Sequence, residues 1–252
     1  MARPFLASVV VLDEVASTSD VARSLVADPR QALPLAVRAL RQTRGRGRGT
    51  NAWWSDEGSL TVTIALDPRA HGLTTAHEPR LALAAAVALI EAVEGFGPTA
   101  QPLGVRWPND VEAAGRKFGG VLPERVETAA GTRLLVGIGF NVSTRLDDAP
   151  EAVRAMAGSL AEIGDGLIDP GSLLEAFVGR FATVLPRLSA DDPSLAARWA
   201  GLDALSGAAV RVDLGTRVVE GIGRGIDAEG ALLLTTAQET LRVFGGRVLR
   251  GG

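Results

Sequence analysis

Apolar residues in the first part of the chain follow two repeats, one typical of strands and one of helices. Valine-rich or alternating apolar runs that end in turn residues predict strands at 5–15, 35–40, 59–66, 105–107, 118–126 and 133–140. Residues 78–94 are alanine-rich and apolar at helical spacing, and Ser17-Thr18-Ser19-Asp20 offers N-caps to a helix over 21–27. The segment between Gln42 and Ser55 is therefore a connection between two strands.

The pattern changes in the second part of the chain. Residues 171–188 and 194–205 predict two helices. From Gly207 onward, Gly and Asp turns separate short apolar runs, which predict strands at 210–214, 217–221, 231–235, 240–244 and 247–249. We expect an α+β fold with a mixed or antiparallel central sheet and flanking helices over residues 1–205, and a small β-barrel over residues 206–252.

Two prolines and one glycine predict local geometry in the first domain. Pro108 lacks an amide donor and favours extended geometry at Trp107, so Asn109-Asp110 should turn away from a short strand. Gly131 suits a hairpin turn between the strands at 118–126 and 133–140. Pro123 interrupts the first of these strands, which predicts an edge position or a bulge there.

Composition is close to that of ordinary soluble globular proteins. Of the 252 residues 46% are hydrophobic, and no run of about 18 apolar residues suggests a membrane span. Asp13 and Glu14 interrupt the N-terminal segment, which lacks the cleavage pattern of a signal peptide, so we expect a cytoplasmic protein. The absence of cysteine excludes disulfides, thiolate metal sites and a cysteine nucleophile, and both histidines, His71 and His77, are expected in a surface loop.

The loop 42–54, Gln-Thr-Arg-Gly-Arg-Gly-Arg-Gly-Thr-Asn-Ala-Trp-Trp, is the first candidate for chemistry. The net charge is -3, but residues 29–55 contain six arginines and no acid. Glycines let backbone amides approach an anion closely, and guanidinium groups bind carboxylate or phosphate through paired hydrogen bonds. The loop therefore predicts an anionic ligand. The alternatives are a solvated basic loop and an arginine-glycine RNA-binding segment, although such segments usually lie in disordered tails.

Lys117 is the second candidate, because it is the one lysine among 26 basic residues. A compact ammonium group reaches a buried oxyanion that a wide guanidinium group cannot, and it can stabilise charge at a reacting phosphate. Gly119 and Gly120 permit close approach at the entrance of an apolar strand. The alternative is a surface lysine without a specific role.

The third candidate is Arg106-Trp107-Pro108-Asn109-Asp110, which places an amide and a carboxylate directly after a strand. Such side chains can hold a metal ion, a loop arginine or a ribose, and a turn held by local backbone hydrogen bonds is an equal alternative. Core packing explains a lone tryptophan better than stacking on adenine does. That explanation is weaker here, because Trp53, Trp54 and Trp107 all lie within or beside these motifs.

Together these motifs resemble those of the biotin protein ligase family. Gln42-Thr43 followed by Gly45-Arg46-Gly47-Arg48-Gly49 and Trp53 resembles its biotin loop, and residues 106–110 are similar to its Lys/Arg-Trp-Pro-Asn-Asp signature. Lys-Phe-Gly-Gly-Val-Leu at 117–122 resembles its lysine strand, and Gly-Ile-Gly-Phe-Asn-Val at 137–142 its nucleotide-side asparagine strand. Ser17-Thr18-Ser19 resembles its Ser-Thr-Asn motif. Four motifs in this order make the resemblance specific.

The resemblance also has implications for the fold. It implies a catalytic core similar to that of class II aminoacyl-tRNA synthetases, and a C-terminal SH3-like barrel from Gly207. The sequence departs from the family at Ser19, where asparagine is common, at Arg44, where a small residue is usual, and at Pro123. Sixteen residues precede Ser17, too few for a DNA-reading domain, so no DNA binding is expected.

The resemblance further implies roles for individual residues. The implied catalytic residues are Lys117, Arg46, Arg48 and Asp110. Those implied to bind biotin are Ser17, Thr18, Ser19, Gln42, Gly45, Arg46, Gly47, Arg48, Lys117 and Gly120. Those implied to bind ATP or the adenylate are Arg46, Arg48, Trp53, Asn109, Lys117 and Asn141. The metal ligands stay open: Mg2+ is carried mainly by ATP, and Asp110 is one candidate ligand.

The reaction implied by the resemblance has two steps. The carboxylate of biotin attacks the α-phosphorus of MgATP to give biotinyl-5'-AMP, and a lysine of a biotin carboxyl carrier protein then attacks the anhydride. The loop 42–54 is expected to close over the adenylate and exclude water. The alternatives are a lipoate or octanoate ligase or transferase with a related core and, less favoured, an arginine-glycine RNA-binding module. A homodimer is compatible with these features, and no membrane partner is expected.

Overall fold

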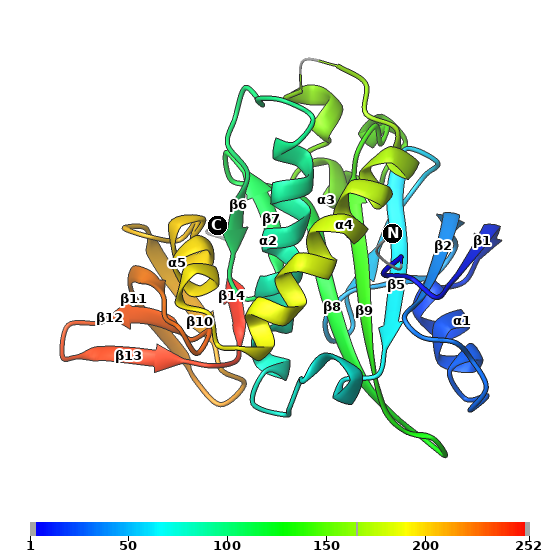
Figure 1. Ribbon diagram of the computed structural model, residues 1–252. Coiled ribbons are helices and arrows are strands. Elements are labelled where there is room, and N and C mark those ends of the chain that lie inside the picture. The colour runs from blue at the N-terminus through cyan, green and yellow to red at the C-terminus, as the bar shows by residue number, and fades with distance from the viewer. Residues whose placement is uncertain (1–3, 165, 250–252) are drawn as a thin grey trace.

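A seven-stranded mixed sheet organises the larger part of the protein (Figure 1). The computed structural model describes residues 4–164 and 166–249, so the outer ends of the two expected domains, 1–3 and 250–252, lie outside the described residues. The strands follow the order β1-β2-β5-β9-β8-β7-β6. Their bounds are β1 Ser8–Val15, β2 Leu35–Gln42, β5 Ser59–Leu66, β6 Gly104–Arg106, β7 Asp110–Ala113, β8 Arg116–Thr128 and β9 Gly131–Asn141.

The pairing of these strands confirms the expected α+β fold with a mixed central sheet. β1 and β2 are parallel, because α1 (Thr18–Leu25) carries the chain back along the sheet between them. The other neighbouring strands of the described sheet are antiparallel. Ser17 takes the N-cap position of α1, but among the described residues its side chain makes no capping hydrogen bond.

Two long helices lie across the sheet, in front of it in Figure 1. α2 (Leu81–Glu94) is alanine-rich and buried over almost its whole length, because α4 (Pro170–Ser189) packs on it. The expected helix at 78–94 begins at Leu81, after a 3-10 turn, and the expected helix at 171–188 is confirmed as α4.

The shorter helical segments differ more from expectation. α5 (Pro193–Gly201) ends before the expected residue 205, because the carbonyl of Leu202 accepts the N–H of Val105 at 2.7 Å and the chain continues beside β6. The remaining segments are α3 Glu151–Arg154 and 3-10 helices at Arg69–His71, Glu78–Arg80, Leu146–Asp148 and Leu160–Glu162.

The C-terminal part forms a five-stranded antiparallel sheet in the order β13-β12-β11-β10-β14. Its strands are β10 Ala209–Asp213, β11 Val218–Ile226, β12 Leu232–Thr235, β13 Thr240–Val243 and β14 Arg247–Leu249. All five expected strands are present. β11 is longer than expected, because the chain stays extended through a bulge between Gly223 and Ile226.

Three local features were not expected from the sequence. The connection after β2 contains a short hairpin of β3 (Gly45–Arg46) and β4 (Ala52–Trp53). Asn109-Asp110 does turn the chain, but Asp110 immediately begins β7, which returns beside β6. The surface-loop expectation for His77 is wrong: its side chain is buried, and its Nδ1 accepts the N–H of Thr74 at 2.9 Å.

Pro123 occupies an edge position, as expected. It pairs with Val136 of β9, whereas β7 pairs with β8 only as far as Gly120. Beyond Gly120 the second side of β8 has no strand neighbour among the described residues, so the missing amide of Pro123 interrupts no second ladder.

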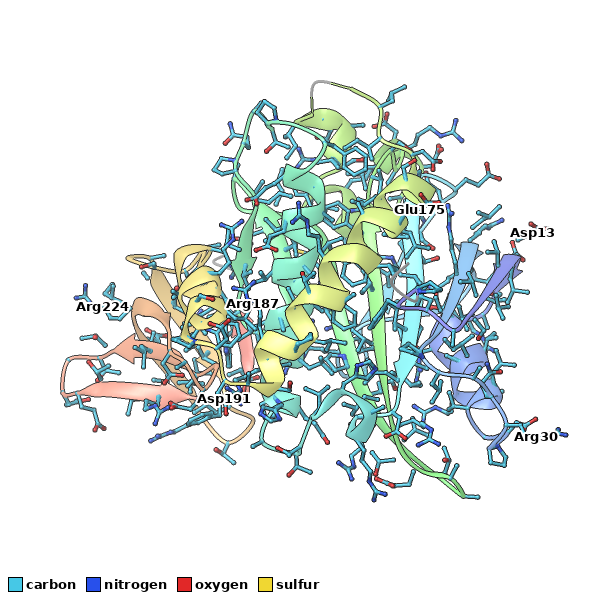
Figure 2. All side chains as sticks on the ribbon, viewed as in Figure 1. Asp13, Arg30, Glu175, Arg187, Asp191 and Arg224 are labelled. Atoms are coloured by element: carbon cyan, nitrogen blue, oxygen red, sulfur yellow. The ribbon has the colours of Figure 1, made fainter. Side chains whose placement is uncertain are left out.

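The two sheets share one hydrophobic core. Its buried side chains continue from α2 and α4 through Trp199 and Leu205 to Val210 and Leu232 of the C-terminal sheet. Charged side chains such as Arg30, Glu175 and Arg224 lie on the outside (Figure 2). The C-terminal sheet is thus packed against the larger unit, which matters for the cavity between them.

Candidate active site

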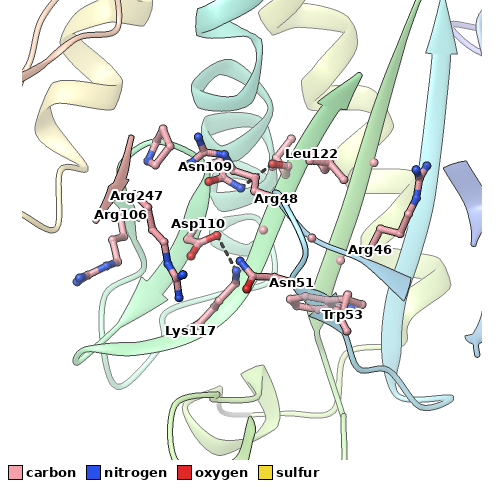
Figure 3. A pocket seen from close by; sticks show the side chains of 18 of the residues that line it. Arg46, Arg48, Asn51, Trp53, Arg106, Asn109, Asp110, Lys117, Leu122 and Arg247 are labelled. Carbon is pink, nitrogen blue, oxygen red and sulfur yellow. Dashed lines mark hydrogen bonds and ion pairs between the residues drawn. The ribbon is translucent and has the colours of Figure 1, made fainter. Parts of the chain in front are cut away.

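A cavity of about 1030 Å³ lies where the central sheet, the loop after β3 and the C-terminal strands meet (Figure 3). The structure brings thirteen of the fourteen residues implied by the resemblance to its wall: Ser17, Thr18, Ser19, Gln42, Arg46, Gly47, Arg48, Trp53, Asn109, Asp110, Lys117, Gly120 and Asn141. Gly45 is the exception. It pairs with Trp53 in the β3–β4 hairpin, where a Cβ would lie 2.5 Å from the carbonyl oxygen of Trp53, so this glycine is needed for the hairpin.

One end of the cavity is formed by uncharged polar groups. The backbone N–H of Thr18 donates to Oε1 of Gln42 at 2.7 Å, and its hydroxyl reaches the same oxygen at 3.1 Å. The hydroxyls of Thr18 and Ser19 lie 2.9 and 3.1 Å from Oγ1 of Thr63. Thr18, Ser19 and Thr63 are buried, so this network is fixed in place. We call Ser17, Thr18, Ser19 and Gln42, together with Thr63, which holds Thr18 and Ser19 from outside the cavity wall, the uncharged end.

Thr63 was missed by the sequence reasoning, although a signal existed. β5 is buried at every position, and a hydroxyl inside such a strand needs a hydrogen-bond partner. Its partners, Thr18 and Ser19, are 45 and 44 residues earlier in the chain. Pairing of β2 with β5 brings the two segments together, which composition alone does not reveal.

The other end of the cavity carries positive charge. Nζ of Lys117 donates to Oδ1 of Asp110 at 2.7 Å, and the two side chains point toward one another in Figure 3. Both remain partly exposed, at 32% and 23%. Arg48 reaches over the cavity and donates from Nη1 to the carbonyl of Gly246 at 3.1 Å. We call Lys117, Asp110, Arg48, Arg106 and Arg247 the cationic end.

The two arginines of the loop have different partners. Nη2 of Arg46 lies 3.0 Å from Glu124 and 3.2 Å from Asp20, and Figure 3 shows its side chain apart from Lys117 and Asp110. Glu124 also binds Arg23 at 3.0 Å. Arg46 therefore fastens the loop to α1 and β8, whereas Arg48 lies at the cationic end.

Trp53 forms a flat wall between the two ends. Its ring packs directly on Gly139, where a Cβ would lie 2.4 Å from the ring, and Nζ of Lys117 lies 5.7 Å from the ring centroid. The amides of Asn109 and Asn141 are held by the protein itself. They donate to the carbonyls of Val121 at 2.8 Å and Gly158 at 2.9 Å.

The C-terminal strands complete the wall, which the motifs did not predict. Arg211 and Asp213 of β10 and Arg247 of β14 line the cavity. Arg106 of β6 lies beside them and donates to the carbonyl of Leu249 at 3.4 Å. The sequence offers no local signal that these strands contribute to the cavity. They lie about a hundred residues beyond the motifs, and their only recognisable pattern is the turn residues between them.

An acidic pair stands behind the cationic end. Oε2 of Glu112 lies 3.6 Å from Nη1 of Arg106. Burial raises the pKa of the neighbouring Asp203 carboxyl, and the charge of Glu112 acts in the same direction. Among residues 4–164 and 166–249, no group of three His, Cys, Asp or Glu side chains is arranged to hold a metal ion.

Comparison with known proteins identifies the family. The model of the biotin/lipoate A/B protein ligase family matches residues 13–141, just over half of the chain, and a biotin protein ligase C-terminal domain model matches residues 205–250. This chain belongs to the biotin/lipoate A/B protein ligase family. The first match contains every site residue that the motifs implied, and the second contains Arg211 and Arg247.

Individual relatives agree with this assignment. The chain is 30% identical over 94% of its length to the biotin--[acetyl-CoA-carboxylase] ligase of Mycobacterium tuberculosis, of which it covers 88%. It is 31% identical over 79% of its length to the ligase of the same name from Paracoccus denitrificans, of which it covers 82%. The biotin protein ligase of Aquifex aeolicus, solved with biotin and ATP, superposes with a TM-score of 0.81 at 27% identity, covering 97% of this chain and 98% of that one.

No helix among the described residues is long and apolar enough to span a membrane.

Proposed function

We propose that this protein is a biotin protein ligase, which activates biotin with ATP and transfers it to a lysine of a biotin carboxyl carrier protein. The observation that carries the proposal is the construction of the cavity, which joins an uncharged hydrogen-bonding end to a cationic end. Biotin has a neutral ureido ring at one end and a carboxylate at the other, and ATP adds negative charge beside that carboxylate. The cavity is complementary to this pair of substrates.

The uncharged end is suited to the ureido ring. Gln42, held by Thr18, and the hydroxyls of Thr18 and Ser19, held by Thr63, supply donors and acceptors without a charge that would need its own counter-ion. Leu122 and Ile138 add apolar wall beside them, which suits the remaining ring and chain of biotin.

The first chemical step joins the two substrates. A carboxylate oxygen of biotin attacks the α-phosphorus of ATP, the bond from that phosphorus to the bridging oxygen breaks, and pyrophosphate leaves with the electron pair. Negative charge accumulates at phosphorus, and the ammonium of Lys117 and the guanidinium of Arg48 are placed to stabilise it. Asp110 orients Lys117, and Mg2+ enters with ATP as part of the substrate.

The second step transfers the acyl group. The amine of the carrier lysine attacks the carbonyl carbon of biotinyl-5'-AMP, a C–N bond forms, the C–O bond to phosphate breaks, and AMP leaves while the amine loses a proton. Trp53 and the loop 42–54 cover the cavity and limit the access of water, which would otherwise hydrolyse the anhydride.

The uncharged end also favours biotin over lipoate, the other substrate class of the family. The dithiolane ring of lipoate has no strong donor or acceptor. Binding it would remove the hydrogen bonds that Gln42 and the surrounding hydroxyls make to water, and the ring would form no new ones. We further expect a cytoplasmic protein that does not bind DNA, and a homodimer is compatible with the proposal.

The test is a transfer reaction. The protein is incubated with MgATP, biotin and a biotin carboxyl carrier domain, and the carrier is analysed by mass spectrometry for one added biotinyl group. Parallel reactions replace biotin with lipoate or octanoate, omit ATP, or use a carrier whose acceptor lysine is changed to arginine. Modification by lipoate at an equal rate, or no modification by biotin, would overturn the proposal.

A further inference from the structure

The turn between β11 and β12 is one place where the C-terminal sheet is fastened to the larger unit. Three side chains of the larger unit donate hydrogen bonds to consecutive parts of this turn. Nε1 of Trp199 donates to the carbonyl of Asp227 at 3.0 Å, Nη1 of Arg80 to that of Ala228 at 3.4 Å, and Nε1 of Trp107 to that of Gly230 at 3.0 Å. Two of the four tryptophans therefore donate hydrogen bonds at this contact.

The side chains that hold the turn are tightly packed. Trp107 and Trp199 are 2% and 1% exposed. Gly230 has a φ of +81°, and a Cβ there would lie 2.9 Å from Cγ of Arg80. Arg80 is itself held by Asp191 at 2.6 Å, which Figure 2 labels at the lower end of α4. The turn thus fits closely against α2 and cannot shift without disturbing these side chains.

Trp107 connects the contact with this turn to the cationic end. Asn109, two residues later, exchanges two hydrogen bonds with Val121 of β8: its Nδ2 donates to the carbonyl of Val121 at 2.8 Å, and the N–H of Val121 donates to its carbonyl at 2.8 Å. Asp110 then accepts from Lys117. The short segment from Trp107 to Asp110 is therefore fixed to the C-terminal turn at one end and to β8 at the other.

We propose that Trp107 is a positioning residue, through which docking of the turn 227–230 fixes the Asp110–Lys117 pair for adenylate formation. The inference rests on the proposed ligase function. It gives the tryptophan of the Trp-Pro-Asn-Asp motif a role different from stacking on adenine, because its indole N–H is used between the two sheets. Trp199 binds the same turn from α5 and lies outside the segment from Trp107 to Asp110, so it provides a matched control.

The experiment compares Trp107→Phe with Trp199→Phe in the full chain. Each change removes one buried indole N–H and keeps an aromatic ring, so both variants should lose similar thermal stability. The rate of biotinyl-5'-AMP formation is measured by pyrophosphate release at saturating biotin and ATP. We expect kcat to fall roughly tenfold in Trp107→Phe, with both KM values within about twofold of wild type, because a misplaced Lys117 loses transition-state stabilisation. In Trp199→Phe, kcat should stay within about twofold.

Gly230→Ala tests the same contact from the other side, because the substitution lies in the turn and its added Cβ presses on Arg80 and Leu83. It should lower kcat as Trp107→Phe does, and the double variant should be no slower than the slower single variant, since both changes act on one contact. If Trp107→Phe does not fold, Gly230→Ala decides alone, and an unchanged kcat in that variant overturns the inference.

Failure of the inference is distinguishable from failure of the proposed function. Wild-type protein that releases no biotin-dependent pyrophosphate contradicts the proposed function. Active wild-type protein with equal kcat in Trp107→Phe and Trp199→Phe leaves the function standing and contradicts the positioning role of Trp107.

Discussion

The two ends of the cavity differ in charge and in exposure. At the uncharged end Ser17, Thr18 and Ser19 are no more than 5% exposed and Gln42 is half-buried, and the hydroxyls of Thr18 and Ser19 are bonded to Gln42 or Thr63. At the cationic end Lys117 and Asp110 are partly exposed, and Arg48 bridges to a different sheet. A fixed, buried network suits recognition of one neutral group, whereas an open, charged region suits phosphates that arrive and leave.

This difference predicts separate kinetic effects for the two ends. Changes at the cationic end should alter charge stabilisation in the transition state and therefore lower kcat. Changes at the uncharged end should weaken the binding of biotin equally in the ground state and the transition state, and should therefore raise the KM for biotin.

The largest effect is expected for Lys117→Ala. Loss of the ammonium group removes the charge proposed to stabilise the α-phosphoryl group and leaves Asp110 without its partner, so kcat for adenylate formation should fall by roughly 10³-fold. Circular dichroism and thermal melting should show a folded protein. Lys117→Arg is the matched control, and it should restore little activity because the guanidinium is wider. Turnover near the wild-type rate in Lys117→Ala would remove Lys117 from the mechanism.

The next effect concerns the two loop arginines. Arg48→Ala should lower adenylate formation on the order of tenfold or more and release biotinyl-5'-AMP into solution, because Arg48 spans the cationic end and fastens the loop to Gly246. Arg46→Ala, the control in the same loop, should affect retention of the adenylate more than its formation, since Arg46 binds Asp20 and Glu124. Free adenylate is quantified by chromatography. Equal loss of adenylate formation in both variants would contradict the division of roles.

A smaller effect is expected from Thr63→Val at the uncharged end. Valine has nearly the shape of threonine but leaves the hydroxyls of Thr18 and Ser19 without their shared partner. The KM for biotin should rise roughly tenfold, while kcat and the KM for ATP change by less than about twofold. Thr61→Val on the same strand is the control, because its hydroxyl bonds to the carbonyl of Ala39 instead. A fall in kcat without a change in the KM for biotin would place Thr63 outside recognition.

Much of this arrangement follows from the sequence, because the motifs carry both local geometry and chemistry. Glycines and prolines fix the conformations near Lys117 and Asp110, and the structure brings both motifs to one cavity, although the ion pair between these two residues was not expected. Apolar runs likewise predicted the strands of both sheets except β7, which begins at Asp110 where only a turn was expected.

The parts that sequence reasoning missed depend on contacts between distant segments. Thr63 joins the site because β5 lies under α1, and Arg247 joins it because β14 lies beside β6. The orientation of Arg46 is also a tertiary effect, because Asp20 and Glu124 compete for it from two other elements. Local pattern identifies an arginine but does not determine its partner.

The smallest effect tests the acids behind the cationic end. Burial raises the pKa of Asp203 above its ordinary value of 3.8, so the folded state retains this proton more strongly than the unfolded state does. Stability associated with Asp203 is therefore fully present below pH 3.8 and is lost as the pH rises through the pKa of the folded state. Asp203→Asn keeps an acceptor for the N–H of Leu205 and removes the charge. At pH 7 it should raise the melting temperature by roughly 2 °C, and the gain should shrink as the pH is lowered toward 3.8. A gain in melting temperature that does not depend on pH would show that burial of the Asp203 charge is not its cause.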